Sequence, residues 1–150
     1  PPPRALARPN PMPNGRLSAL RAAHALLRSP QVREVDEAEL EVLVASRTAP
    51  MVIDFYATWC GPCVLMAQEL TKLGEAMGER VTILKIDVDK NENIASALKI
   101  EGLPTLILVP AEQERPAMRL EGLLPAEALA DICEKEFFGA GEAAAAAAEE

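Results

Sequence analysis

Two cysteines separated by two residues stand where a predicted strand meets a predicted helix, in the segment Trp59-Cys60-Gly61-Pro62-Cys63. The preceding residues, 51–57, are short, apolar and rich in β-formers, which indicates a buried strand. The residues from Cys60 to about Met77 have apolar side chains at helical spacing. A Cys-x-x-Cys pair at a helix start is typical of reversible dithiol–disulfide exchange.

The position of each cysteine predicts its part in that chemistry. A cysteine attacks a disulfide as the thiolate, and the free N–H groups and dipole of a helix N-terminus favour an anion. Cys60 is therefore the expected nucleophile. Cys63, one turn further along, is placed to attack the mixed disulfide and release the reduced partner. Pro62 costs no hydrogen bond in the first turn of the helix and stiffens the loop.

Asp54 is the expected proton acceptor for Cys63. It lies in the middle of the apolar strand, where an unpaired charge is costly. Burial should raise its pKa toward neutrality, which is what a general base requires. Lys85, on the next predicted strand, is its expected partner. The alternative is a buried Asp–Lys pair with a purely structural role.

A zinc site is the alternative interpretation of the cysteines. Structural zinc takes four ligands, but the chain offers only Cys60, Cys63, Cys133 and His24, without a second Cys-x-x-Cys pair. Three cysteines are also too few for a disulfide scaffold. We therefore expect no metal and no bound organic cofactor, and a pair that cycles in a reducing compartment.

Cys133 shares a helical face with apolar residues, which predicts a buried and inert thiol. The alternative is a site of glutathionylation or of an intermolecular disulfide.

Charge and composition divide the chain into three parts. Residues 1–30 hold five arginines, no acidic residue and seven of the 13 prolines, although the net charge of the chain is −8. This pattern predicts an organellar transit peptide, or else a proline-rich disordered leader. Residues 31–138 form the expected domain, and residues 139–150 are a low-complexity Ala/Glu tail. The acidic domain argues against direct nucleic-acid binding, and no apolar run reaches the roughly 20 residues of a membrane span.

Apolar periodicity and punctuation by Gly and Pro predict the elements of the domain. A capping pattern, Asp36 with Glu39, begins the first helix, and Gly78 ends the second. Strands alternating with helices predict a largely parallel sheet covered on both faces. The expected helices span 36–47, 60–77, 91–98 and 125–138, and the expected strands 51–57, 81–88, 103–109 and 118–121.

The run from Val52 to Cys63, followed by Gly102-Leu103-Pro104-Thr105, resembles the thioredoxin family over residues 31–138. The resemblance implies an α/β fold with a central mixed five-stranded sheet flanked by four α-helices. It also implies the following roles: Cys60 as nucleophile, Cys63 as resolving thiol, Asp54 as buried proton acceptor, Lys85 as its partner, Pro104 as a cis-proline, Leu103, Pro104 and Gly122 as substrate-binding residues, and Trp59, Gly61 and Pro62 as the redox loop.

Several residues depart from the common family pattern. Val64 and Leu65 follow the second cysteine, where a lysine is usual at the first position, and Tyr56 stands where many members have tryptophan. With the run 64–70 and the segment 120–125, these features resemble the chloroplast thioredoxin z group. An apolar rim of this kind predicts a restricted set of partners.

This resemblance implies reduction of protein disulfides in the chloroplast stroma or nucleoid. It implies that an upstream thiol reductase, linked to ferredoxin or to another thioredoxin, reduces the oxidised Cys60–Cys63 pair again. It further implies association with the plastid-encoded RNA polymerase and with fructokinase-like proteins. The rival hypothesis is a structural subunit of a plastid transcription complex, whose redox activity is incidental.

Overall fold

The computed structural model describes residues 32–139, so the predicted leader 1–30, with His24, and the tail beyond Gly139 lie outside the described residues. The elements within this range are β1 (Val32–Glu34), α2 (Glu37–Ala45), β2 (Met51–Tyr56), α3 (Gly61–Met77), a 3-10 turn η1 (Gly78–Arg80), β3 (Thr82–Asp87), α4 (Glu92–Ala97), β4 (Thr105–Val109), β5 (Met118–Glu121), α5 (Ala126–Cys133) and a π-helical turn η2 (Glu134–Phe138).

The five strands form one sheet in the order β1-β3-β2-β4-β5. Strand β3 runs parallel to both β1 and β2, whereas β4 runs antiparallel to β2 and to β5. The sheet is therefore mixed, as the family resemblance implies, and the expectation of a largely parallel sheet is wrong. The reason is that only residues 110–117 join β4 to β5, which makes these two strands a hairpin.

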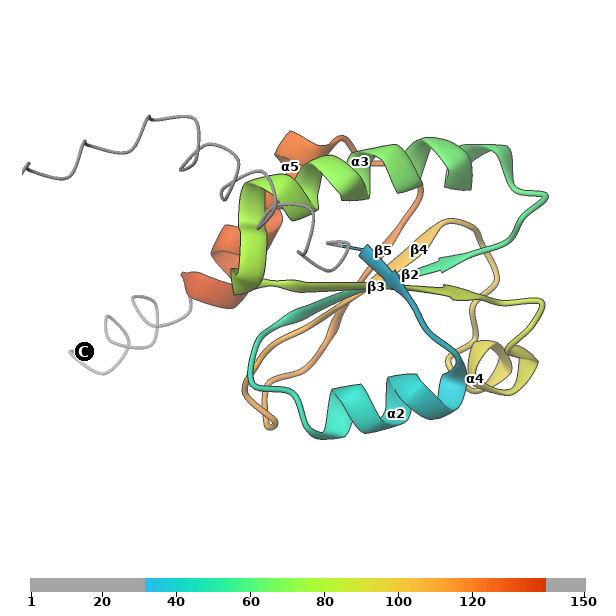
Figure 1. Ribbon diagram of the computed structural model, residues 1–150, viewed down its shortest axis with the longest axis horizontal. Helices are drawn as coiled ribbons and strands as arrows, with labels where there is room; N and C mark the ends of the chain where they lie inside the picture. Colours follow the sequence, from blue (N-terminus) through green and yellow to red (C-terminus); the bar gives the residue numbers. More distant parts are fainter. Residues whose placement is uncertain (1–31, 140–150) are drawn as a thin grey trace, which may run out of the picture. The chain divides into compact units, whose positions relative to one another are not determined.

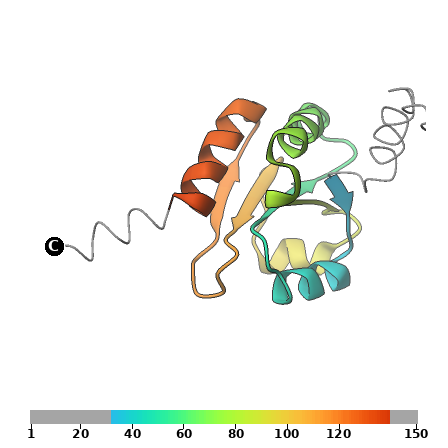
Figure 2. The same cartoon turned by 60° about the vertical axis from the view of Figure 1, so that its left-hand side comes forward.

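Helices cover both faces of the sheet. Helices α3 and α5 lie on one face and helices α2 and α4 on the other, as two views show (Figures 1 and 2). Successive side chains of strand β2 point to opposite faces of the sheet, so this strand contributes to the core on both sides. Val52 packs in the core under α3 and α5, and Ile53 and Phe55 pack in the core under α2 and α4. Asp54, two residues after Val52, consequently faces the α3 side.

The capping pattern at α2 is half formed. The Asp36 Oδ1 accepts a hydrogen bond from the Glu39 backbone N–H at 2.8 Å, which caps the helix as the sequence predicts. The Glu39 carboxylate does not return to Asp36 but pairs with Arg33 at 3.0 Å. Helix α2 is thereby linked to the strand that precedes it.

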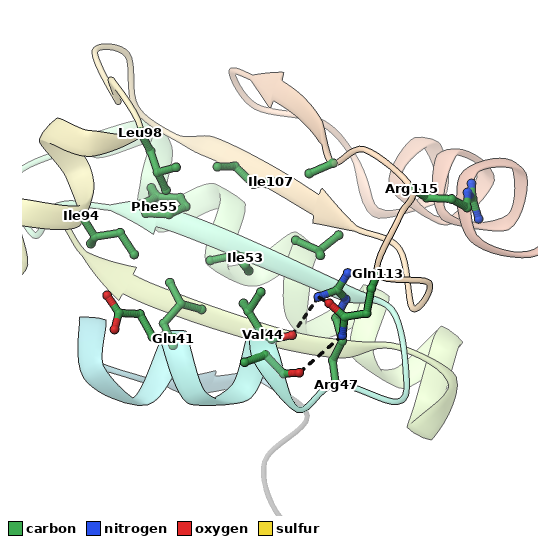
Figure 3. A pocket seen from close by; sticks show the side chains of 14 residues that line it. Glu41, Val44, Arg47, Ile53, Phe55, Ile94, Leu98, Ile107, Gln113 and Arg115 are labelled. Atoms are coloured by element: carbon green, nitrogen blue, oxygen red, sulfur yellow. Dashed lines mark hydrogen bonds between the residues drawn. The ribbon is translucent and has the colours of Figure 1, made fainter.

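A pocket of about 520 Å³ lies between α2, α4 and the sheet and is lined in part by exposed side chains such as Glu41 and Gln113 (Figure 3). The chain has only 3% aromatic residues, and much of the lining consists of short aliphatic side chains such as Val44. Arg47 closes one end, where its guanidinium donates hydrogen bonds to the carbonyl oxygens of Val44, Pro110 and Glu112.

Most elements end within two residues of the predicted ranges, and two differ by more. Residue patterning predicted only four strands and missed β1, because three residues are too short for a clear alternation signal, although the family resemblance implies a fifth strand. The last helix was expected to continue to residue 138, but α5 ends at Cys133 and the chain continues as the π-turn η2. No helix within residues 32–139 has the length and apolar character needed to cross a membrane.

Candidate active site

The two cysteines meet at the junction of β2 and α3. They are joined by a disulfide, with 5.3 Å between their Cα atoms, which is in the ordinary range for a disulfide. Cys60 is the N-cap of α3, and its Sγ accepts a hydrogen bond from the Cys63 backbone N–H at 3.3 Å. The helix N-terminus therefore faces the Cys60 sulfur, which is the arrangement that favours a thiolate there.

The loop around the disulfide is accessible while the sulfurs are largely covered. Cys60 and Cys63 are buried, whereas Gly61 and Pro62 are exposed and Trp59 is 72% exposed. A partner can therefore reach Cys60 only by packing against this loop.

Asp54 lies below the disulfide and lines one pocket of about 210 Å³ together with Cys63. Its side chain is 1% exposed, and its Oδ1 has no hydrogen-bond partner among the described residues. Burial raises the pKa of Asp54 from 3.8 to about 7, and the positive charge of Lys85 limits the rise. A carboxyl with a pKa near neutrality, in the same pocket as a thiol, is suited to take up a proton from it.

Lys85 is the registered partner of Asp54 across β2 and β3. Within residues 32–139 no ion pair of 4.0 Å or less includes Lys85. Its ammonium instead lies 5.6 Å from the centroid of the Tyr56 ring. Lys85 therefore acts on Asp54 through its charge rather than through a direct contact.

The predicted substrate-binding loops also lie beside the disulfide. Leu103 packs against the small buried cluster that contains Cys60 and Cys63. The Leu103–Pro104 peptide bond is cis, and the Pro104 carbonyl accepts a hydrogen bond from the Gly122 N–H at 2.9 Å. Gly122 has a φ of 92°, a conformation that residues with a Cβ rarely adopt.

Sequence reasoning missed Asp89. Its carboxylate accepts a hydrogen bond from the Trp59 indole N–H at 2.8 Å, and its own backbone N–H donates to the Asp87 carboxylate at 2.9 Å. Thirty residues separate Trp59 from Asp89, so no local pattern could have paired them. The hydrogen bond fixes the direction of an exposed indole beside the disulfide.

Cys133 is fully buried in the core under α3 and α5, as its helical face predicts. Burial and the neighbouring Glu134 raise the pKa of this thiol to about 11. Cys133 thus lies in a different cluster from the disulfide. In the described part of the chain, no group of three or more His, Cys, Asp or Glu residues is placed to hold a metal ion.

Comparisons with known proteins agree with this geometry. A family model described as thioredoxin matches residues 31–135. The chloroplastic thioredoxin-like protein CITRX of Arabidopsis thaliana is 41% identical over 106 residues, and that of Solanum lycopersicum is 39% identical over 106 residues. Each alignment covers 70% of this chain but only 58% and 61%, respectively, of the relative.

This chain covers nearly the whole length of two solved structures of similar fold. The crystal structure of a chloroplastic thioredoxin z is 42% identical with a TM-score of 0.68, covering 72% of this chain and 96% of that one. A mutant thioredoxin from Halobacterium salinarum is 33% identical with a TM-score of 0.61, covering 72% and 93%. The matched family model, the shared fold and the Cys-x-x-Cys pair at the helix start lead to one conclusion: this chain belongs to the thioredoxin family.

Proposed function

We propose that the chain is a thiol–disulfide oxidoreductase that reduces disulfides of partner proteins. The observation that carries this proposal is the position of the Cys60–Cys63 pair at the N-terminus of α3, together with a buried Asp54 that lines the same pocket as Cys63. This arrangement provides a nucleophile, a resolving thiol and a proton acceptor within one site.

The reaction proceeds in two exchanges. The Cys60 thiolate attacks one sulfur of the partner's disulfide, a new S–S bond forms, and the first partner thiolate leaves. The Cys63 thiol then gives its proton to the Asp54 carboxylate and attacks the Cys60 sulfur, which releases the second partner thiolate. The partner gains two electrons and the chain is left as the disulfide. An upstream thiol reductase, linked to ferredoxin or to another thioredoxin, returns the two electrons.

The rim of the site is apolar and exposed. Trp59, Val64 and Leu65 are 72%, 58% and 50% exposed, so a partner that covers them removes apolar surface from water. We propose that Leu103 pairs its backbone with an extended partner segment next to Pro104 and Gly122, as strand addition does elsewhere. A rim without a charge after Cys63 favours partners whose own disulfide lies in an apolar surface.

The proposed location is the chloroplast stroma or nucleoid. The two CITRX relatives are chloroplastic proteins, and the solved thioredoxin z is a chloroplastic protein with type-specific target recognition. For this chain we propose the plastid-encoded RNA polymerase and its fructokinase-like proteins as partners.

A trapping experiment tests the reductase. In Cys63→Ser, the mixed disulfide with Cys60 cannot be resolved, so we expect partners to accumulate covalently bound to this variant. Cys60→Ser is the matched control and should trap none, because it lacks the proposed nucleophile and its remaining thiols, Cys63 and Cys133, are both buried. If Cys63→Ser captures no more than Cys60→Ser from a stromal extract, disulfide reduction through Cys60 is wrong.

The scaffold hypothesis gives a different result. An apolar rim can serve a lasting contact as well as a transient one. Replacement of both cysteines by serine removes all exchange while leaving Trp59, Val64 and Leu65 in place. If the double variant still assembles with the polymerase and restores transcription, the essential role is structural; if transcription fails while assembly persists, the redox chemistry is essential.

A further inference from the structure

A row of three charged residues crosses the sheet on the face that carries the disulfide. Glu34 on β1 is the registered partner of Lys85 on β3, and Lys85 is the registered partner of Asp54 on β2. Registered partners on neighbouring strands point to the same face of a sheet. The Lys85 side chain therefore stands between two carboxylates, of which Glu34 is exposed and Asp54 is 1% exposed.

These two carboxylates differ in what they offer an ammonium group. An ion pair with Glu34 at the surface leaves the Lys85 ammonium hydrated, whereas approach to Asp54 requires it to lose water. If Glu34 had no other partner, an ion pair between Lys85 and Glu34 would cost less desolvation free energy than an approach of Lys85 to Asp54. A Lys85 drawn toward β1 would stabilise the Asp54 carboxylate less.

Tyr56 binds the Glu34 carboxylate. The Tyr56 hydroxyl donates a hydrogen bond to the Glu34 Oε1. Because β3 lies between β1 and β2, this hydrogen bond crosses the middle strand next to Lys85. Burial, the hydrogen bond and the Glu34 charge hold the pKa of Tyr56 well above its ordinary value, so the phenol remains a donor.

The same ring also contacts Lys85. The ammonium lies 5.6 Å from the centroid of the Tyr56 ring, a distance at which a cation is attracted to the ring face. Tyr56, Lys85 and Asp54 all line the 210 Å³ pocket below Cys63. The ring thus lies next to the Lys85 ammonium, and its hydroxyl engages the carboxylate of Glu34.

We propose that Tyr56 is a positioning residue: by engaging the Glu34 carboxylate through its hydroxyl and the Lys85 ammonium through its ring, it keeps Lys85 available to Asp54. This inference rests on the proposed proton transfer from Cys63 to Asp54. Its consequence is that Tyr56 helps to set the pH at which Asp54 can accept that proton.

Few other titratable groups face Asp54. On β3, Asp87 is the registered partner of Tyr56, and its carboxylate already accepts a hydrogen bond from the Asp89 N–H. On α3, the pocket contains Cys63, which does not titrate while it is disulfide-bonded, and on β4 the registered partner of Asp54 is Leu106. Glu34 and Asp54 therefore compete for the Lys85 ammonium, and Tyr56 can change the outcome of this competition.

A carboxyl carbon NMR titration of Asp54 in the oxidised protein tests the proposal without any turnover. We expect Tyr56→Phe, which keeps the ring and removes the hydroxyl, to raise the pKa of Asp54 by about 0.5 or more, because the freed Glu34 competes for Lys85. In Tyr56→Phe combined with Glu34→Gln, the competitor has lost its charge, and the pKa should return to within about 0.2 of the wild-type value. Glu39→Gln, which removes an exposed carboxylate paired with Arg33 on β1, should leave the pKa of Asp54 unchanged.

Two results would overturn the proposal. One is an Asp54 titration that Tyr56→Phe does not change. The other is an equal rise in Tyr56→Phe and in the double variant, since this would reflect altered packing or hydration around the ring rather than competition by Glu34. Circular dichroism and an intact disulfide establish that each variant is folded before it is titrated.

Activity separates this inference from the proposed function. If the wild-type chain reduces protein disulfides, the pH at which its rate is half-maximal should rise in Tyr56→Phe and return in the double variant. If the wild type reduces none, the proposed function fails whatever the NMR titration gives. If the wild type is active but neither titration moves, the positioning role alone is wrong.

Discussion

Asp54 and Cys63 line the same small pocket beneath the first turn of α3, and the Asp54 Oδ1 has no hydrogen-bond partner within the described residues. A buried carboxyl without a partner weakens the folded state unless it is protonated.

Asp54→Asn should stabilise the oxidised protein in a pH-dependent way. The pKa of Asp54 is raised from 3.8 to about 7, so the folded state binds this proton more tightly than the unfolded chain does. The cost is absent below about pH 4, grows as the pH rises toward 7 and is constant above that value. We expect the variant to exceed the wild type by roughly 2–4 kcal/mol at pH 8 and not at pH 4, measured by urea unfolding.

The matched control is Asp87→Asn. Asp87 is 3% exposed, but its carboxylate accepts a hydrogen bond from the Asp89 N–H. Its replacement should not stabilise the protein. A gain in Asp54→Asn that is the same at pH 4 and pH 8 would contradict the raised pKa of Asp54.

The pocket under α2 predicts a second stabilising substitution. Val44 lines this pocket of about 520 Å³, so Val44→Leu adds a methylene group where there is room for it (Figure 3). We expect a gain of about 0.5–1 kcal/mol in the free energy of unfolding. Val42→Leu controls for helix propensity because Val42 lies on the same helix and is 66% exposed. Equal gains in the two variants would mean that the pocket is not filled by residue 44.

Cys133 should be inert in the folded protein. It is fully buried, and the pKa of its thiol is raised to about 11, so it forms little thiolate at pH 8. A thiol-reactive dye should label no cysteine in the native oxidised protein and one after denaturation. After reduction of the native protein, any labelling should occur at Cys60 and Cys63 and not at Cys133. Rapid labelling of Cys133 in the native state would support the alternative of a modification site.

Local patterns predicted the parts of the fold that depend on neighbouring residues. The Asp36 cap, the junction of strand and helix at Cys60 and the buried face of Cys133 all follow from spacing along the chain. The short strand β1 and the π-turn η2 were not predicted: β1 is too short for a clear alternation signal and pairs with the distant strand β3, and Phe137 of η2 packs in the core under α3 and α5.

The candidate site shows the same division. The cysteines and Asp54 were identified from the sequence because each is unusual where it stands. The hydrogen bonds from Trp59 to Asp89 and from Tyr56 to Glu34 join residues 30 and 22 positions apart. Such pairs become visible only when the order of the strands is known.

A redox titration of the Cys60–Cys63 couple tests the central claim most directly. Thioredoxins have a reduction potential of about −270 mV, and a tenfold change in the equilibrium constant corresponds to about 30 mV for two electrons. We predict a single two-electron transition within about 30 mV of that value, which is lost in Cys60→Ser. A strongly oxidising potential near about −120 mV would make the chain an oxidant or a sensor and contradict its role as a reductase.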